Sequence, residues 1–392
     1  MTRPLPPLAM ILLLWAAGLG AAGQFAKLSV AFPALRDSYP EAGASLGFAV
    51  SLISFVGLIL GLVAGMIVAR LGYRKLLLAG LLLGAAMSAV QAGLPSFPVF
   101  LASRLIEGLS HLVIVVAAPT FIAELAPDRL RASAMTLWST FFGVAYALAA
   151  WGGLPLIAAF GPGALFGLHA AYMTLMATVL WLYLPRLDVR AAATSLAPGA
   201  LLRQHLRIYS NPRLSAAALG WFCYTLTFVA LLTVLPLVLG PEAPGWLLGV
   251  LPLTSIAISL TLVVALLRFV PAVRVVMLGF GLSAIAVVLI WALPGAIWPV
   301  VVLFAALAPV QAASFAAIPQ LNAEPQDRAL ANGAVAQMGN LGNLSGTPVL
   351  LAVLGAFGPS GGLAVVLVSY LLGLALHLMT AAVRARSAVP PT

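Results

Sequence analysis

Long runs of apolar residues, each bounded by proline, glycine or a charged residue, fill almost the whole chain. A helix needs about 20 apolar residues to cross a bilayer, and twelve of these runs reach about that length. The pattern therefore predicts twelve transmembrane helices, six in each half of the chain. Their expected ranges are 8–33, 44–69, 75–94, 98–122, 133–159, 163–185, 213–239, 245–268, 274–293, 296–318, 329–357 and 361–383.

One longer polar stretch, residues 186–212, separates the two sets of six apolar runs. It carries several basic residues, among them Arg186, Arg190, Arg203 and Arg207. We interpret this stretch as a cytoplasmic linker. It divides the chain into an N-terminal six-helix bundle at 1–185 and a C-terminal six-helix bundle at 213–392.

The composition agrees with a chain that lies mostly within a membrane. Of the 392 residues, 63% are hydrophobic and 7% are charged, whereas about a quarter of a soluble protein is charged. An ordinary soluble enzyme, a disordered protein and a nucleic-acid-binding protein are thereby excluded. The net charge of +10 does not change this, because the basic residues are scattered between apolar runs. The single cysteine, Cys223, excludes a disulfide framework.

The distribution of Lys and Arg indicates the direction of the helices, because short loops rich in these residues stay in the cytoplasm. With a cytoplasmic N-terminus, sixteen basic residues fall in cytoplasmic segments and one, Arg36, falls on the opposite side. This asymmetry predicts that both termini are cytoplasmic, and it supports an even number of crossings. We expect an integral, multi-pass protein of the plasma (inner) membrane.

Two loops at corresponding places in the halves carry a short repeat. Asp128-Arg129 follows the fourth apolar run and Asp327-Arg328 follows the tenth, and small residues come after each pair. Parallel repeats related by an axis along the membrane normal are one of the known transporter arrangements. We therefore predict an all-α polytopic membrane protein whose two six-helix bundles are related by pseudo-two-fold symmetry.

The loop after the second apolar run carries a motif of glycines and basic residues. Gly65 allows two helices to approach closely and Gly72 permits a tight turn, while the arginines can bind carbonyl groups at nearby helix ends. The segment resembles the Gly-x-x-x-Asp-Arg-x-Gly-Arg-Arg/Lys motif of the major facilitator superfamily, with Ala69 and Tyr73 as departures. It reads Gly65-Met-Ile-Val-Ala69-Arg70-Leu-Gly72-Tyr73-Arg74-Lys75.

Two further segments extend this resemblance. Arg104-x-x-x-Gly108 is similar to the Arg-x-x-x-Gly motif of helix 4 in that superfamily, and Asp128-Arg129 resembles the loop that follows it. The resemblance implies a twelve-helix fold in which helices 1, 4, 7 and 10 surround a central cavity. It also implies a role in conformational gating for Gly65, Arg70, Gly72, Arg74, Asp128 and Arg129.

Charged residues inside apolar runs point to function, because placing one at a helix centre costs roughly 2.5–3.5 kcal/mol. Three such residues are Lys27, Arg104 and Glu107. Lys27 lies one helical turn from Gln24, so the two share a face of the first helix. The resemblance implies that this face lines the cavity and binds substrate. The alternative is a structural Lys27 whose long side chain reaches the membrane interface.

In the fourth run, Arg104, Glu107 and His111 point to the same side. Two cations then face one carboxylate, which leaves a positive charge for an anionic substrate, since a buried unpaired cation is strongly unfavourable. Arg104 resembles an arginine of the anion:cation symporters, a branch of the same superfamily that also carries a proton-coupling glutamate on helix 4. Glu107 or His111 could take that second role. For His111 the alternative is a neutral imidazole hydrogen-bonded within the bundle.

The second half of the chain offers neutral polar groups. Tyr224 in the seventh run and Gln311 in the tenth are candidate hydrogen-bonding partners of a substrate, and Asn340 in the eleventh is a candidate contact. The glycines around Asn340 favour close helix packing. The candidate substrate-binding residues are therefore Gln24, Lys27, Arg104, Tyr224, Gln311 and Asn340.

These features predict a secondary active transporter that moves a small anionic solute by alternating access, coupled to protons. The alternative is a proton-driven exporter of amphiphilic or drug-like compounds. Such exporters carry Gly-Pro-x-x-Gly-Gly in helix 5, whereas this chain has the glycine pair Gly152-Gly153 alone.

The sequence contains no nucleophile–base pair, phosphate loop or His-Glu-x-x-His motif. We therefore expect no enzyme activity, no cofactor and no metal. The expected partners are an anionic small molecule, protons and membrane lipid, and not nucleic acid. We expect the protein to be a monomer.

Overall fold

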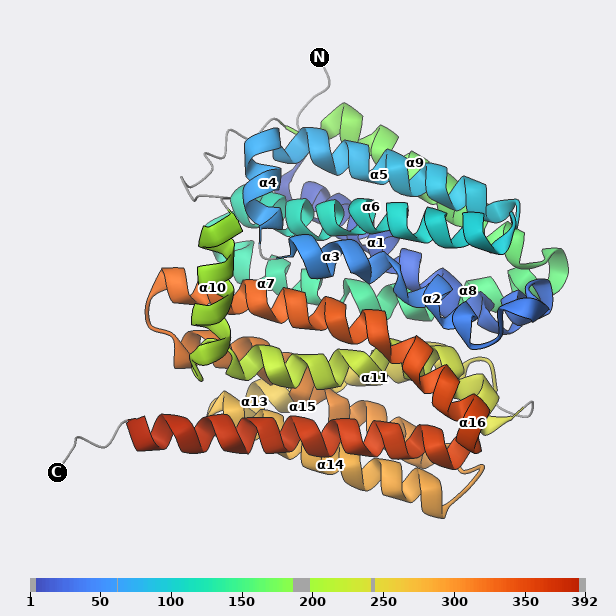
Figure 1. The fold of residues 1–392 in the computed structure, drawn as a ribbon. Coiled ribbons are helices and arrows are strands. Elements are labelled where there is room, and N and C mark those ends of the chain that lie inside the picture. Colours follow the sequence, from blue (N-terminus) through green and yellow to red (C-terminus); the bar gives the residue numbers. More distant parts are fainter. Residues whose placement is uncertain (1–4, 62, 186–197, 241–243, 388–392) are drawn as a thin grey trace. The chain divides into compact units, whose positions relative to one another are not determined.

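The structure is a computed structural model that describes residues 5–61, 63–185, 198–240 and 244–387. Within these ranges every regular element is a helix. The chain divides into two compact units, each considered separately here (Figure 1). The first comprises residues 1–57, 63–194 and 244–250, and the second comprises residues 58–62, 195–243 and 251–392. The domain boundaries at 185 and 213 stay predictions.

Long apolar helices build the first unit. They are α1 (Pro7–Ser38), α5 (Tyr73–Ala92), α6 (Phe97–Leu125), α8 (Phe141–Phe160) and α9 (Pro162–Tyr183). α1 packs against α6, α8 and α9, while α5 packs against α6 and α9. The core between them is apolar and includes Leu14, Leu81, Phe121, Met173 and Leu180.

Two of the predicted helices of this unit are interrupted. The run at 44–69 consists of the 3-10 helix η1 (Pro40–Leu46), α2 (Gly47–Ser51), α3 (Ile53–Leu60) and α4 (Ala64–Leu71). The chain bends by 46° where α2 meets α3.

The predicted helix at 133–159 is divided at one residue, because α7 (Asp128–Ser139) ends before Thr140 and α8 begins after it, while Thr140 itself has helical backbone angles. The Thr140 hydroxyl donates to the carbonyl oxygen of Leu137 at 2.8 Å. Such local side-chain bonds compete with the helical ladder.

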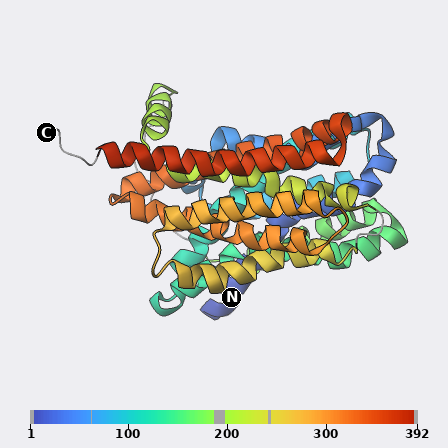
Figure 2. The ribbon, with the colours of Figure 1, turned by 90° about the horizontal axis from the view of Figure 1, so that it is seen from below.

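The long helices α11, α14, α15 and α16 of the second unit run side by side, while α10 lies across them (Figure 2). α11 packs against α15 and α16, and α14 packs against the same two helices. The elements are α10 (Pro198–Ser210), α11 (Ala216–Leu239), α12 (Leu247–Ile258), the π-helical turn η2 (Ser259–Val263), α13 (Val264–Leu266), α14 (Ala272–Ala292), α15 (Trp298–Leu321) and α16 (Pro325–Ser387).

Part of the predicted linker folds as the helix α10, while residues 186–197 lie outside the described ranges. α10 is held against α16 by polar contacts. Arg207 donates to the Asp327 carboxylate at 2.6 Å, and the Tyr209 hydroxyl donates to Gln337 Oε1 at 2.9 Å. Burial raises the pKa of Tyr209 to about 12, so the phenol stays protonated and continues to donate.

The predicted helices at 329–357 and 361–383 are continuous in α16, which has 63 residues and a sharp bend at Gly358. Gly358 has φ 66° and ψ −167°, a conformation that is essentially restricted to glycine. The two arms on either side, visible in Figure 1, are about 50 Å and about 44 Å long at 1.5 Å per residue. Each arm exceeds the roughly 30 Å of a bilayer core.

Ten helices within the described ranges are long and apolar enough to cross a membrane, and the bent pair at 40–60 gives an eleventh. α16 counts once in that number although each of its arms is long enough to cross. Counting the arms separately gives twelve, in agreement with the sequence. The chain is an integral, multi-pass membrane protein.

Replacing Gly358 by alanine should destabilise the protein by about 1–3 kcal/mol, because a side chain strains this backbone conformation. The effect isolates the backbone, since an added Cβ would meet nothing within 4 Å. Gly355→Ala is the matched control: it lies in the same helix with equally open surroundings, and alanine favours a helix by up to about 1 kcal/mol. Thermal unfolding in detergent should show a lower Tm for Gly358→Ala only. An unchanged Tm would contradict the bend.

Candidate functional site

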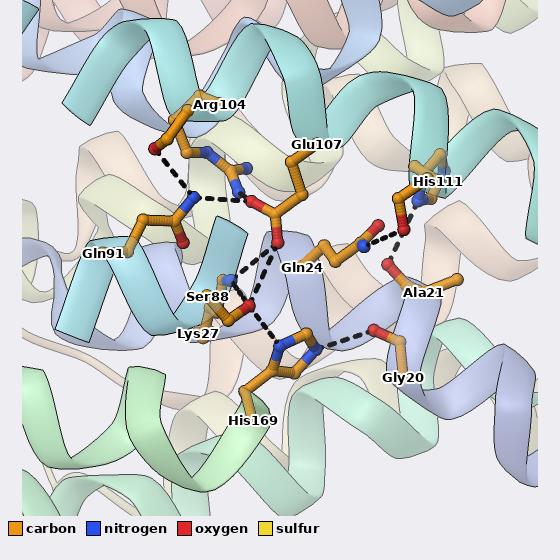
Figure 3. A network of polar contacts seen from close by, with 12 residues as sticks. Gly20, Ala21, Gln24, Lys27, Ser88, Gln91, Arg104, Glu107, His111 and His169 are labelled. Carbon is orange, nitrogen blue, oxygen red and sulfur yellow. Dashed lines mark hydrogen bonds and ion pairs between the residues drawn. The ribbon is translucent and has the colours of Figure 1, made fainter. Parts of the chain in front are cut away.

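Four helices of the first unit bring polar side chains together in an otherwise apolar interior (Figure 3). α1 contributes Lys27, α5 contributes Ser88 and α9 contributes His169, while Arg104 and Glu107 come from α6. Arg104 and Glu107 are three residues apart and therefore lie on one face of α6. Both are fully buried.

The Glu107 carboxylate lies at the centre of this cluster. Its Oε1 accepts from Lys27 Nζ at 2.7 Å, and its Oε2 accepts from Arg104 and from Gln91 Nε2, the latter at 2.8 Å. One carboxylate thus forms ion pairs with two cations. Charge-assisted hydrogen bonds of this kind are roughly twice as strong as neutral ones.

Lys27 is 1% exposed and extends into the unit, not toward its surface. Besides Glu107, its ammonium group donates to Ser88 Oγ at 2.6 Å and lies 5.7 Å from the centre of the Phe166 ring. An ammonium group over an aromatic face gains a further electrostatic attraction. The alternative that Lys27 extends to the membrane interface does not describe this conformation, since its nitrogen is bound within the unit.

Arg104 connects the cluster to the bend between α2 and α3. Its Nε donates to the carbonyl oxygen of Ala49 at 2.6 Å. Gly108, one turn later, allows the carbonyl oxygen of Ile53 to approach α6, where a Cβ would collide with it. The two named positions of the Arg-x-x-x-Gly motif therefore both contact the bend, one through hydrogen bonds and the other through its lack of a side chain.

The other polar residue predicted on α1 is also buried. Gln24 is fully buried, and its Nε2 donates to Ser110 Oγ at 2.8 Å. The sequence pattern predicts that Gln24 and Lys27 face water or substrate, whereas in this conformation they face α5 and α6. A stripe of polar residues on a helix indicates burial away from lipid, but it does not distinguish a cavity from the interior of a bundle.

His111 lies apart from the ion pairs. Its Nδ1 donates to the carbonyl oxygen of Ala21 at 3.1 Å, and its ring packs edge-on against Phe25. This is the hydrogen-bonded arrangement that the sequence analysis gave as the alternative to proton coupling. The coupling role of His111 stays a prediction.

Ser88, Gln91 and His169 were not predicted to be part of the site. His169 Nδ1 lies 2.8 Å from Ser88 Oγ, and its Nε2 lies 2.9 Å from the carbonyl oxygen of Gly20. Their signal in the sequence is weak. Ser88 and Gln91 are three residues apart in an apolar run, and His169 is the one histidine in another.

The predicted binding residues of the second unit are not joined in one cluster. The Tyr224 ring is buried and stacks against Trp221 and Phe228, with ring centres 4.6 and 5.2 Å apart. Asn340 Nδ2 donates at 2.8 Å to the backbone one turn earlier in its own helix, and Gln311 is partly buried. Their roles in binding stay predictions.

The predicted gating segment makes the turn and one of the helix-end contacts expected of it. Gly72 has φ 97°, at the turn between α4 and α5. Arg74 donates to the carbonyl oxygens of Trp181 and Leu184 at 2.7 and 2.8 Å, which closes the C-terminal end of α9. Gly65 and Arg70 lie within α4. The gating role of all four residues stays a prediction.

The second predicted gating pair is arranged differently from the sequence motif. Asp128 forms an ion pair at 2.9 Å with Arg131, not with Arg129, which is exposed. Arg131 also donates to the carbonyl oxygen of Ala123 at 2.9 Å, near the end of α6. Spacing explains this choice, because residues three apart on a helix face the same side and adjacent residues do not.

The cluster carries two positive charges and one negative charge. Among the described residues, Glu107 is the acidic side chain bound to either cation, so one positive charge is offset only by neutral oxygen atoms. These belong to Ser88, Ala49 and Val50. No group of three His, Cys, Asp or Glu side chains suited to a metal occurs in the described part of the chain.

The shared carboxylate predicts an order of stability among variants. Glu107→Gln leaves two buried cations without a counter-charge, and removing one partner of a buried pair costs about 3–5 kcal/mol. Lys27→Met leaves a charge-balanced Arg104–Glu107 pair, so it should lower the Tm less. Glu324→Gln, the same substitution at an exposed position, should leave the Tm nearly unchanged. A larger loss for Lys27→Met than for Glu107→Gln would contradict this electrostatic balance.

Comparison with known proteins identifies the family. The family model described as Major Facilitator Superfamily matches residues 13–346. The galactose-proton symporters of two Escherichia coli strains, K12 and O6:H1, are 28% identical to the chain over 108 residues. That match covers 28% of this chain and 23% of the length of each symporter.

A solved structure shares the fold over nearly the whole length. The crystal structure of the human organic anion transporter MFSD10 (TETRAN) is 20% identical, with a TM-score of 0.71, and the match covers 96% of this chain and 100% of the other. The all-helical architecture therefore extends through both halves. Together with the family model, which spans most of the sequence, this shows that the chain belongs to the major facilitator superfamily of membrane transporters.

Proposed function

We propose that this protein is a proton-coupled secondary transporter for a small anionic solute. The observation that carries the proposal is the cluster of Lys27, Arg104 and Glu107, in which two buried cations share one carboxylate. The remaining positive charge favours a negatively charged ligand at any stage of transport that opens the cluster to water. An anion there would replace contacts to neutral oxygen atoms with a full counter-charge.

The cost of the cluster supports a functional role over a purely structural one. Burying ions costs several kcal/mol each, and replacing a buried ion pair with well-packed apolar residues is often neutral or stabilising. If these positions contributed only to stability, apolar side chains such as leucine or phenylalanine would stabilise the interior equally well. Charged groups inside transmembrane helices are characteristic of ion and substrate pathways.

The names of two similar proteins support the same proposal. The human structural neighbour is named as an organic anion transporter, and the partly similar bacterial protein is named as a galactose-proton symporter. The first name agrees with an anionic cargo and the second with coupling to protons. The arginine distribution favours cytoplasmic termini in a plasma (inner) membrane, and we expect the monomer to be the transporting form.

Lys27→Ala should reduce anion-driven proton movement on the order of ten- to hundredfold, because a charged hydrogen-bonding partner is worth about 1.5–3 kcal/mol. The measurement uses proteoliposomes with a trapped pH indicator, to which lactate, succinate, nitrate or phosphate is added. The matched control is Arg36→Ala, which removes an exposed cation from the same helix and should leave the signal unchanged.

Two outcomes would contradict the proposal. One is proton movement driven by a lipophilic cation and by none of the four anions, which would favour the exporter alternative. The other is an equal response to an anion in the Lys27→Ala variant and the unmodified protein. That result would show that the buried ammonium group is not needed for transport.

A further inference from the structure

Three charged or titratable groups surround the Ser88 hydroxyl in the first unit (Figure 3). Its oxygen lies 2.6 Å from Lys27 Nζ, 2.8 Å from His169 Nδ1 and 3.4 Å from Glu107 Oε1. A hydroxyl has one proton to donate and two lone pairs to accept with. The three neighbours therefore compete for the orientation of one small group.

The protonation of His169 follows from its partners. Nε2 lies 2.9 Å from the carbonyl oxygen of Gly20, which can only accept, so Nε2 carries a proton in either charge state. The ammonium group of Lys27 can only donate, and it takes one lone pair of Ser88. With a neutral imidazole, the Ser88 proton points at His169 Nδ1, which is the one ring nitrogen left to gain a proton.

Both nitrogens of His169 and the Ser88 hydroxyl keep a partner when His169 gains that proton. Nδ1–H then donates to the second lone pair of Ser88, and the hydroxyl proton turns away from the imidazole toward Glu107 Oε1. The imidazole gains one proton and one positive charge, while the covalent O–H bond of Ser88 stays intact. Burial and the positive charges of Lys27 and Arg104 oppose protonation of His169, whereas the Glu107 carboxylate and the acceptor oxygen of Ser88 favour it.

We propose that His169, acting through Ser88, is the residue that holds the co-transported proton. His111 is bound elsewhere, because its Nδ1 donates to the backbone carbonyl oxygen of Ala21. This proposal rests on the proposed anion–proton transport and deepens it, because it assigns the coupling to a side chain other than His111 or Glu107.

The charges that face His169 explain why its proton would be coupled to an anion. They are Lys27 from α1 and Arg104 and Glu107 from α6, while α5 contributes the neutral Ser88. The Tyr146 hydroxyl of α8 is bonded to Ser29. These three charges sum to one positive, and a protonated His169 raises the total for the four groups to two positive. An anion that enters offsets this increase, so proton and anion each favour binding of the other by the same free energy.

The protonation of His169 can be measured without knowing the substrate. The chain has four histidines, so nitrogen NMR of histidine-labelled protein in nanodiscs can be assigned with single variants. We expect a signal with a proton on Nε2 at high pH that converts to the doubly protonated form on acidification. It should be absent in His169→Gln and present in His377→Gln, a control at another buried histidine.

Variants of Ser88 distinguish a relay from simple packing. Ser88→Ala removes the acceptor for Nδ1–H and should shift the conversion to lower pH, whereas Ser88→Thr keeps a hydroxyl and should restore it. If His169 stays singly protonated over the whole range in which the protein is folded, the proposal is wrong. An identical conversion in Ser88→Ala and the unmodified protein would also overturn the role of Ser88.

Transport completes the test and separates this proposal from the proposed function. A pH difference of about one unit, or about 1.4 kcal/mol per proton, sustains about a tenfold accumulation of a co-transported monoanion. His169→Gln should reduce this to about onefold while anion exchange continues. Accumulation that persists in His169→Gln and is lost in His111→Ala would overturn the present inference alone. Absence of anion transport by the unmodified protein would instead overturn the proposed function.

Discussion

The Glu107 carboxylate forms ion pairs with two buried cations, and the interior of the first unit depends on this contact. Lys27 and Arg104 reach it from different helices, α1 and α6. Because attraction between charges is far stronger in a low dielectric than in water, the carboxylate holds these helices in register. For the same reason the contact is sensitive to protons and ions, since any of them that changes the charge of Glu107 alters the packing of both helices.

Arg104 extends this electrostatic contact to the backbone. It binds Glu107 and also the carbonyl groups of Ala49 and Val50, at the bend where α2 meets α3. A bend leaves backbone carbonyls without their helical partners, and buried carbonyls need donors. A side chain that fills both roles links the charge of the cluster to the geometry of the second transmembrane segment. A change in the charge of Glu107 can therefore alter the bend between α2 and α3.

Much of the fold follows from the sequence because bilayer thickness imposes a length on each apolar run. The bend at Gly358 lies in the gap between two predicted helices, whereas the one-residue break at Thr140 lies within a predicted helix. Thr140 keeps helical backbone angles within its apolar run, while Gly358 takes a positive φ next to Pro359, which lacks a backbone N–H. Within the site, Lys27 and Glu107 can be recognised from the sequence, because placing a charged residue inside a transmembrane helix has a high free-energy cost.

Their neutral partners are not recognisable, because serine is common in transmembrane helices and carries little insertion cost. Yet Ser88 lies where an ammonium, an imidazole and a carboxylate meet. A carboxylate in its place would neutralise the excess positive charge, and an alkyl side chain would leave Nδ1 of His169 without a partner. A hydroxyl does neither, and it reorients without moving a charge through the hydrocarbon interior. In the proposed mechanism, the group with the weakest sequence signal is thus the one that lets His169 gain a proton while keeping a hydrogen-bond partner.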